Sequence, residues 1–410
     1  MELKLNALDR RIYATNSGED TTINGISRRE VVANGRLLTV EYVGRELNER
    51  PDMKGSFISR LDSKKISLSD YARKVTEDTI RYCAAIANRA SGRDTEVTFE
   101  SVTRDPSYAR DTTFLRTLAA ITQDVLNPLV FSVMSDTTQG GLMQWEPIPF
   151  GGTKAIDIAS NDVFLFEDSA WGSAKSASYN TLYDKTVTLN PHPYTTQAKI
   201  KWYQLMVNGD IGRFYAAIIR GMESKIYAIF LSKLTGAVSN TALIPSGLTA
   251  SGYTTGNWNL LTTKVAAANG IRRDNLLAFG TISALSKVIP TDGLGAAITG
   301  LQYGLGEQWF RSGFLPNAAG VQLLEVTPAI VPGTQNSTIE IMDTGTNIFI
   351  AAKGGYGYAP IYGGYYEGTP LTLEMTPELT GDLTIDVTAT AAFDTKAVFG
   401  SKVGVITSVA

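Results

Sequence analysis

The clearest pattern of apolar positions lies between Asp210 and Leu234, where large apolar residues recur every three or four positions. This spacing is typical of an amphipathic helix, which at 1.5 Å per residue would be about 35 Å long. Asp210 can cap its first turn, and Gly236 can end it. We expect its buried face to contain the following residues: Phe214, Ile218, Met222, Ile226 and Phe230.

Residues 153–200 follow the two-residue period of β-strands on either side of a polar tip. Apolar residues alternate from Ile156 to Leu165 and again from Val187 to Ile200, and the tip is Gly172–Tyr179. This pattern predicts a long β-hairpin. Because a two-stranded hairpin is only marginally stable alone, we expect it to need a partner surface.

The remaining elements predict an α+β fold with helices before the main strands. Residues 1–60 read as an extended arm with strand-like pieces such as Leu37–Val43, and residues 134–152 read as loop and short strand. Pro128 should limit or bend the helix that precedes it. Shorter helices are expected at 67–90, 114–125, 257–268 and 281–288. Strands are expected at 276–280, 321–326, 339–342, 347–352, 371–375, 383–389 and 402–406.

Composition and charge narrow the class of protein. The 410 residues suit two or three domains of about 150 residues. Residues 1–110 hold 19 Lys and Arg against 17 Asp and Glu, and the rest holds 18 against 23, so we expect a boundary near Asp111. The net charge of −3 gives the whole chain no nucleic-acid footprint. Without an apolar span or signal core, we expect a soluble protein from a reducing compartment.

Few residues could carry catalysis. Cys83 is the single cysteine and His192 the single histidine, which excludes an internal disulfide and a metal site built from histidines. Cys83 falls on the apolar face of a predicted helix, and His192 lies between two prolines. Gly354–Gly357 and Gly363–Tyr366 do not follow a phosphate-loop pattern, and such Tyr/Gly segments more often contact another protein. We expect no catalytic residue, cofactor or metal.

Carboxylates on one predicted strand leave an enzyme as an alternative. Asp382 and Asp386 lie four positions apart and share a strand face. A glycosidase built on Asp382 or Glu374 would use such groups as an acid/base pair. We interpret them instead as the solvated outer face of a strand.

The order of the predicted elements carries more information than any single motif. A charged N-terminal segment with a helix precedes the hairpin, the long helix follows it directly, and a mixed α+β region with Gly-rich loops comes next. In this order, and in segments such as Asn275–Ser286 and Ala389–Ile406, the chain resembles the major capsid proteins of tailed bacteriophages, which have the Hong Kong 97-like fold. The resemblance covers residues 115–410 well and residues 1–114 loosely.

This resemblance implies a division of the chain into the parts of that fold. Either Gly293–Gly306 or Gly354–Gly364 would approach the axis of a capsomer. The implied parts are an N-terminal arm with a helix (1–110), a peripheral domain with a spine helix (111–152 and 201–256, spine 210–235), an extended loop formed by the β-hairpin (153–200), an axial domain (257–385) and a C-terminal strand that returns to the peripheral domain (386–410).

The resemblance also implies a function: self-assembly, as pentamers and hexamers, into an icosahedral shell around double-stranded DNA that is bound non-specifically. It implies a place in the virion after assembly in the host cytoplasm, no membrane, and portal, scaffold or decoration proteins as further partners. Alternatives are an encapsulin-like nanocompartment shell, another virion component such as a tail protein and, last, an enzyme. The residues expected to contribute to assembly are Lys175, Tyr179, Lys185, Tyr356, Tyr358, Tyr365 and Tyr366.

Overall fold

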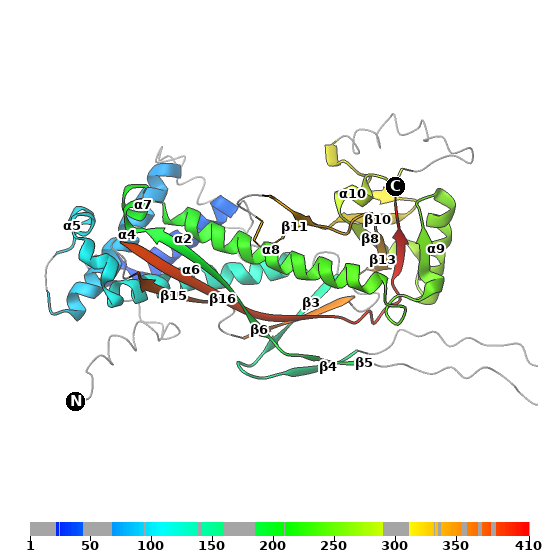
Figure 1. Ribbon diagram of the computed structural model, residues 1–410, viewed down its shortest axis with the longest axis horizontal. Coiled ribbons are helices and arrows are strands. Elements are labelled where there is room, and N and C mark those ends of the chain that lie inside the picture. The colour runs from blue at the N-terminus through cyan, green and yellow to red at the C-terminus, as the bar shows by residue number, and fades with distance from the viewer. Residues whose placement is uncertain are drawn as a thin grey trace, which may run out of the picture. The chain divides into compact units, whose positions relative to one another are not determined.

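The computed structural model divides the chain into two compact units, each built from three segments. Unit one comprises Met1–Ser135, His192–Glu223 and Glu367–Ala392, and unit two comprises Asp136–Pro191, Ser224–Tyr366 and Phe393–Ala410. The structure describes residues 22–23, 25–43, 68–93, 96–137, 142–158, 185–208, 210–289, 311–331, 333–334, 338–353, 359–367, 371–378 and 383–409. Both helices and sheets are present in quantity, which confirms the predicted α+β class (Figure 1).

Helices dominate unit one. Leu38 of α2 packs against Ala72 and Val75 of α4 in an apolar cluster. Apart from the strands of its larger sheet, the described elements of unit one are β1 (Thr22–Ile23), β2 (Ile26–Ser27), α2 (Arg28–Val43), α4 (Leu68–Ala90), α5 (Phe99–Arg104), η1 (Pro106–Arg110), α6 (Thr112–Thr137), α7 (Trp202–Asn208) and the first part of α8 (Ile211–Val238).

The prediction of strand-like structure at Leu37–Val43 is wrong, because these residues form the end of helix α2. Val31, Val32, Gly35, Leu38 and Thr39 are the buried residues of α2, and they follow the helical period. The local run of Leu, Thr and Val favoured a strand. Packing of the helical face against α4 overrides that preference.

Helix α6 continues past Pro128, which the sequence analysis expected to limit or bend it. A proline lacks the N–H that would bond to the carbonyl four residues earlier, here Asp124. The guanidinium of Arg36 donates to that carbonyl oxygen from Nε and Nη2, at 3.1 and 2.7 Å. Burial lowers the pKa of Arg36. A side chain from α2 therefore replaces the missing backbone bond, and residues up to 137 remain helical.

Unit one also contains a sheet region in which β15 and β6 both pair with β16. The bounds are β6 (His192–Lys201), β15 (Leu371–Pro377) and β16 (Thr384–Ala397), whose last residues belong to unit two. Leu371, Leu373 and Met375 alternate into the interior of the unit. The pairing of β6 corrects the predicted hairpin, since Ala198 and Ile200 lie in this sheet and not in the second arm.

A six-stranded sheet forms the centre of unit two, in the order β7-β17-β13-β8-β10-β9. Every residue of β8 and β13 is buried, which is expected for strands covered on both faces. Their bounds are β7 (Thr249–Ser251), β8 (Leu276–Gly280), β9 (Asn317–Ala318), β10 (Val321–Glu325), β13 (Ile348–Ala352) and β17 (Gly404–Thr407). The helices of this region are η3 (Ser246–Leu248), α9 (Thr255–Ala268), η4 (Arg273–Asn275) and α10 (Ile282–Leu285).

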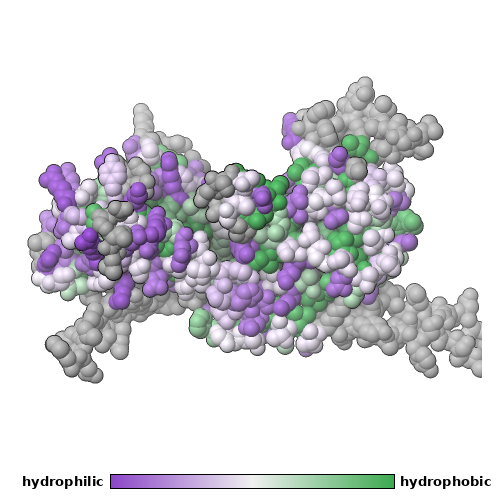
Figure 2. All heavy atoms as spheres, in the orientation of Figure 1, coloured by the Kyte–Doolittle hydropathy of each residue, from purple (hydrophilic) through white to green (hydrophobic). Residues whose placement is uncertain are grey.

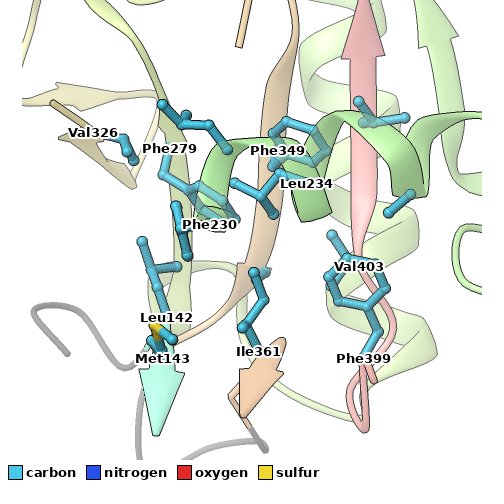
Figure 3. Close-up of a cluster of buried hydrophobic side chains, with 14 of the residues drawn as sticks. Leu142, Met143, Phe230, Leu234, Phe279, Val326, Phe349, Ile361, Phe399 and Val403 are labelled. Atoms are coloured by element: carbon cyan, nitrogen blue, oxygen red, sulfur yellow. The ribbon is translucent and has the colours of Figure 1, made fainter. Parts of the chain in front are cut away.

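The two faces of this sheet pack into separate apolar clusters. Phe279 and Phe349 lie on one face with Phe230 and Leu234 of α8, and their own rings stack 5.6 Å apart (Figure 3). Trp258 of α9 belongs to the cluster on the other face, with Ala278, Ile350 and neighbouring residues of the same strands. The second part of α8 and helix α9 therefore cover opposite faces of the sheet.

The resemblance implied that residues 386–410 return to the peripheral domain; the structure divides this segment, with residues up to 392 in unit one and the rest, including β17, in unit two. β17 pairs with β13 and β7 inside the six-stranded sheet. Val405 belongs to one apolar cluster and Ile406 to the other. Because both faces of the strand are buried, the apolar run Val403–Ile406 suits a central position in that sheet.

Smaller β-pairs complete unit two. Gly363 and Gly364, which the sequence analysis treated as part of a loop, lie within strand β14, and residues 143–148 form a full strand. β14 pairs in parallel with β3 and antiparallel with the end of β16. The bounds are β3 (Met143–Ile148), β4 (Lys154–Ile158), β5 (Lys185–Leu189), β11 (Ala329–Ile330), β12 (Ile341–Met342) and β14 (Ile361–Tyr366).

Two glycines provide a matched test of packing. A Cβ on Gly363 would lie 2.5 Å from Cε3 of Trp145, whereas a Cβ on Gly221 in α8 would have no atom within 4 Å. We expect Gly363→Ala to destabilise the protein by about 1–3 kcal/mol through overpacking. We expect Gly221→Ala to stabilise it by about 0.5–1 kcal/mol through helix propensity. Thermal unfolding of both variants checks the sign, and equal shifts in the same direction would contradict this packing.

Candidate functional site

The clearest projecting element among the described residues is the ribbon formed by β4 and β5. Lys154 pairs with Leu189 at its inner end and Ile158 with Lys185 at its outer end. Within the described residues, these two strands pair only with each other. Ala155, Asp157, Thr186 and Thr188 are exposed. These four residues alternate along the two strands, so one face of the ribbon is exposed.

The inner end of the ribbon is attached to unit two by charge and by apolar contact. The Lys154 ammonium lies 2.8 Å from a carboxylate oxygen of Glu146 on β3, and this hydrogen bond lowers the pKa of Glu146. Ile156 and Val187 pack against a small cluster that contains Tyr362. One face of the ribbon is therefore anchored through Ile156 and Val187, whereas its opposite face is exposed.

The predicted assembly residues fall into two groups. Lys175, Tyr179, Tyr356 and Tyr358 lie outside the described residues. Lys185 lies at the outer end of β5, opposite Ile158. The structure therefore places one of these five residues on the ribbon, and the assembly role of all five stays a prediction.

Tyr365 and Tyr366, the other two predicted assembly residues, lie in β14 and contact their own chain. The Tyr365 ring meets Trp145 edge to face, with centroids 6.4 Å apart. The Tyr366 hydroxyl donates to the carbonyl oxygen of Pro191 at 3.1 Å, and its ring centroid lies 5.1 Å from that of Phe150. Both tyrosines are half-buried. Their described contacts hold β14 to the segments beside it.

Most of the predicted buried face of the long helix is buried in α8. Ile226 is fully buried, Ile218, Met222 and Phe230 are buried, and Phe214 is half-buried. The sequence analysis missed Leu231 and Leu234, which are also fully buried. Both residues pack with Phe230 in the apolar cluster of unit two.

Hydrophilic side chains gather over the helices of unit one on the face shown in Figure 2. This agrees with the high density of charge before Asp111. On the sheet of the same unit, the Lys199 ammonium lies 2.7 Å from Glu378 and 3.8 Å from Asp386. The hydrogen bond to Glu378 raises the pKa of Lys199. Asp386 is thus part of a surface ion pair across β6 and β16.

The residues considered for chemistry are dispersed. The Nε2 atom of the exposed His192 lies 2.6 Å from the Tyr194 hydroxyl, and Glu374 is exposed on β15. Asp382 lies outside the described residues. In the part of the chain that the structure describes, no three His, Cys, Asp or Glu side chains are grouped to hold a metal ion. None of the described helices is long and apolar enough to cross a membrane.

Cys83 is expected to resist thiol reagents in the folded protein. It is fully buried in α4, and burial raises the pKa of its thiol, so the reactive thiolate is scarce. Labelling with a coloured disulfide reagent should therefore be complete only after denaturant is added. Labelling of the native protein at the denatured rate would contradict the burial of Cys83.

Comparisons with known proteins find structural likeness without a sequence relative. No family model and no curated protein matches the chain. It is similar to a structure from Mycobacterium phage Che8, with TM-score 0.38, 11% identity, and coverage of 63% of this chain and 85% of that one. For the capsid of cyanophage P-SCSP1u, the TM-score is 0.39 and the identity is 10%, and the match covers 65% of this chain and 86% of that one. For the holo-SrpI encapsulin complex from Synechococcus elongatus, the TM-score is 0.36 and the identity is 10%, and the match covers 65% of this chain and 85% of that one.

Proposed function

We propose that the protein is a major capsid protein that assembles into an icosahedral shell enclosing double-stranded DNA. The observation that carries this proposal is the β4–β5 ribbon, which is anchored along one face and exposed along the other, and whose strands pair only with each other within the described residues. A two-stranded ribbon is marginally stable alone. A surface on a neighbouring copy would supply the burial that its own unit does not.

Two further features support assembly from identical copies. The long helix α8 runs the length expected for the spine of such a subunit and is apolar along its buried side. The net charge of −3 on 410 residues keeps repulsion between copies small. Closed point-group symmetry is the usual outcome when identical subunits associate.

The same proposal specifies partners and location. The subunits form pentamers and hexamers, and packaged DNA contacts the inner surface without sequence specificity. Portal, scaffold and decoration proteins are the further partners of such a shell. The protein belongs to the virion and is assembled in the host cytoplasm, with no enzymatic activity of its own.

Electron microscopy of the purified full-length protein tests the proposal. Closed shells of uniform diameter, built from rings of five and six subunits, are the expected result. Tubes would indicate a tail component, and a protein cargo without nucleic acid inside native particles would indicate a nanocompartment. A protein that remains monomeric at high concentration would overturn self-assembly.

A further inference from the structure

Three consecutive residues at the inner end of the ribbon are each held by a different contact. The side chain of Leu189 is fully buried beside Gly364 of β14. The next residue, Asn190, donates its backbone N–H to the Asp394 carboxylate of β16 at 3.0 Å. Pro191 then accepts a hydrogen bond on its carbonyl oxygen from Tyr366. We refer to residues 189–191 with these partners as the ribbon root.

Gly364 and Asp394 face each other across β14 and β16, so they occupy neighbouring positions beneath the root. A Cβ on Gly364 would lie 3.1 Å from Cβ of Leu189 and 2.6 Å from Cδ1 of Ile148. A side chain at this position would therefore displace Leu189. Gly364, which has no side chain, leaves room for Leu189, and the carboxylate of Asp394 accepts the N–H of Asn190.

Asp394 is suited to hold the backbone of the root. Only 5% of its surface is exposed. One carboxylate oxygen accepts the N–H of Asn190, with the Lys396 ammonium 3.7 Å away, and the other accepts the N–H of Thr395 at 2.8 Å. Hydrogen bonds to a charged acceptor are stronger than neutral ones. Because Pro191 has no N–H, Asn190 is the last residue before β6 that can donate from its backbone.

We propose that Asp394 is a positioning residue that sets the direction in which the β4–β5 ribbon leaves unit two, and that it thereby orients the ribbon for contact with a second copy of this chain. Leu189 is paired with Lys154, so the position of the root fixes the start of both strands. The assembly part of this inference rests on the proposed function. The geometric part, that Asp394 restrains the root, does not.

Hydrogen exchange at Asn190 measures the restraint directly in the full-length protein. A peptide that spans Leu189–Pro193 contains two prolines without amides, so few N–H groups contribute to its signal. We expect Asp394→Ala to accelerate exchange of this peptide by about tenfold or more, the effect of losing a hydrogen bond to a charged group. Asp394→Asn keeps a carbonyl oxygen and should give a smaller acceleration. Unchanged exchange in Asp394→Ala would overturn the restraint.

Asp157→Ala is the matched control. Asp157 is an exposed carboxylate on β4 that accepts a hydrogen bond from the Thr186 hydroxyl at 2.7 Å. Asp157→Ala removes one carboxylate, as Asp394→Ala does, but leaves the contacts of the root intact. We expect exchange at Asn190 to equal that of the wild-type protein, and only this readout is used for the control, because Asp157 lies on the exposed face of the ribbon that is proposed to meet a second copy. Acceleration as large as in Asp394→Ala would show that the effect is not specific to Asp394, and would overturn the proposal.

Shell yield by electron microscopy measures the consequence for assembly. We expect Asp394→Ala to remain folded by circular dichroism but to lose closed shells, with partial recovery in Asp394→Asn. Faster exchange together with wild-type shells would overturn the positioning role. If the wild-type protein itself forms no shells, the proposed function fails, while the exchange result still decides whether Asp394 restrains the root.

A second substitution tests the restraint at the ribbon root if Asp394→Ala does not fold. Gly364→Ala leaves Asp394 intact and pushes on Leu189 instead. If Asp394→Ala is insoluble, we expect Asp394→Asn and Gly364→Ala both to accelerate exchange at Asn190 and to lower shell yield. Wild-type behaviour of both variants in both measurements would overturn the proposal.

Discussion

Replacing Ile226 with aspartate is expected to abolish the yield of folded, soluble protein. Ile226 is fully buried in α8. An ionised carboxylate transferred to such a site costs several kcal/mol unless it is paired, against a total stability of about 5–15 kcal/mol for a typical domain. Soluble yield and far-ultraviolet circular dichroism are the measurements.

Ser232→Asp provides the control for this substitution. Ser232 is exposed on the same helix, so the new charge stays in water. Its yield and circular dichroism should match those of the wild-type protein. If Ile226→Asp behaved in the same way as Ser232→Asp, the buried side of α8 would be wrongly assigned.

Shortening the ribbon is expected to leave a folded subunit that no longer forms shells. Ile158 and Lys185 are opposite each other in the register of β4 and β5. A two-residue Asn-Gly turn in place of residues 159–184 can therefore join the strands directly. The anchoring contacts at the inner end remain, whereas the segment expected to reach a neighbouring copy is removed. Circular dichroism and electron microscopy give the two readouts.

The control for this shortening is a variant in which residues 159–184 are replaced by a Gly/Ser segment of equal length. It should also fold and fail to assemble, because it restores length without the side chains that recognise a neighbour. Shells of normal size and yield from the shortened chain would show that residues 159–184 are not needed for assembly.

Periodic apolar patterns allowed the main elements to be predicted. The three- and four-residue spacing of α8 and the continuous apolar runs of β8 and β13 are local signals. The burial of these elements in the folded protein agrees with the structure that each signal predicts. The exceptions arise where a distant side chain changes the local outcome. Helix α6 passes Pro128 because Arg36 satisfies the carbonyl of Asp124, and these two residues lie 88 positions apart.

The candidate site was predictable only in part for the same reason. Alternation indicated the paired arms of the ribbon, and β4 with β5 confirms their inner ends. The residues that hold them were not found, because Asp394 and Asn190 are 204 positions apart and no sequence pattern links them. The Gly363–Gly364 pair did carry a signal, since glycines inside a strand often mark a close approach of other atoms.

The interleaving of the two units constrains when a subunit can mature on the ribosome. Unit one needs residues 367–392 to complete its sheet, and unit two needs residues 393–410 for β17. Synthesis delivers the N-terminal segments first, so neither unit can complete its strands until residues beyond 367 have been made. A nascent chain that ends before residue 367 therefore lacks strands of both units, and unit one receives its last segment before β17 of unit two is made.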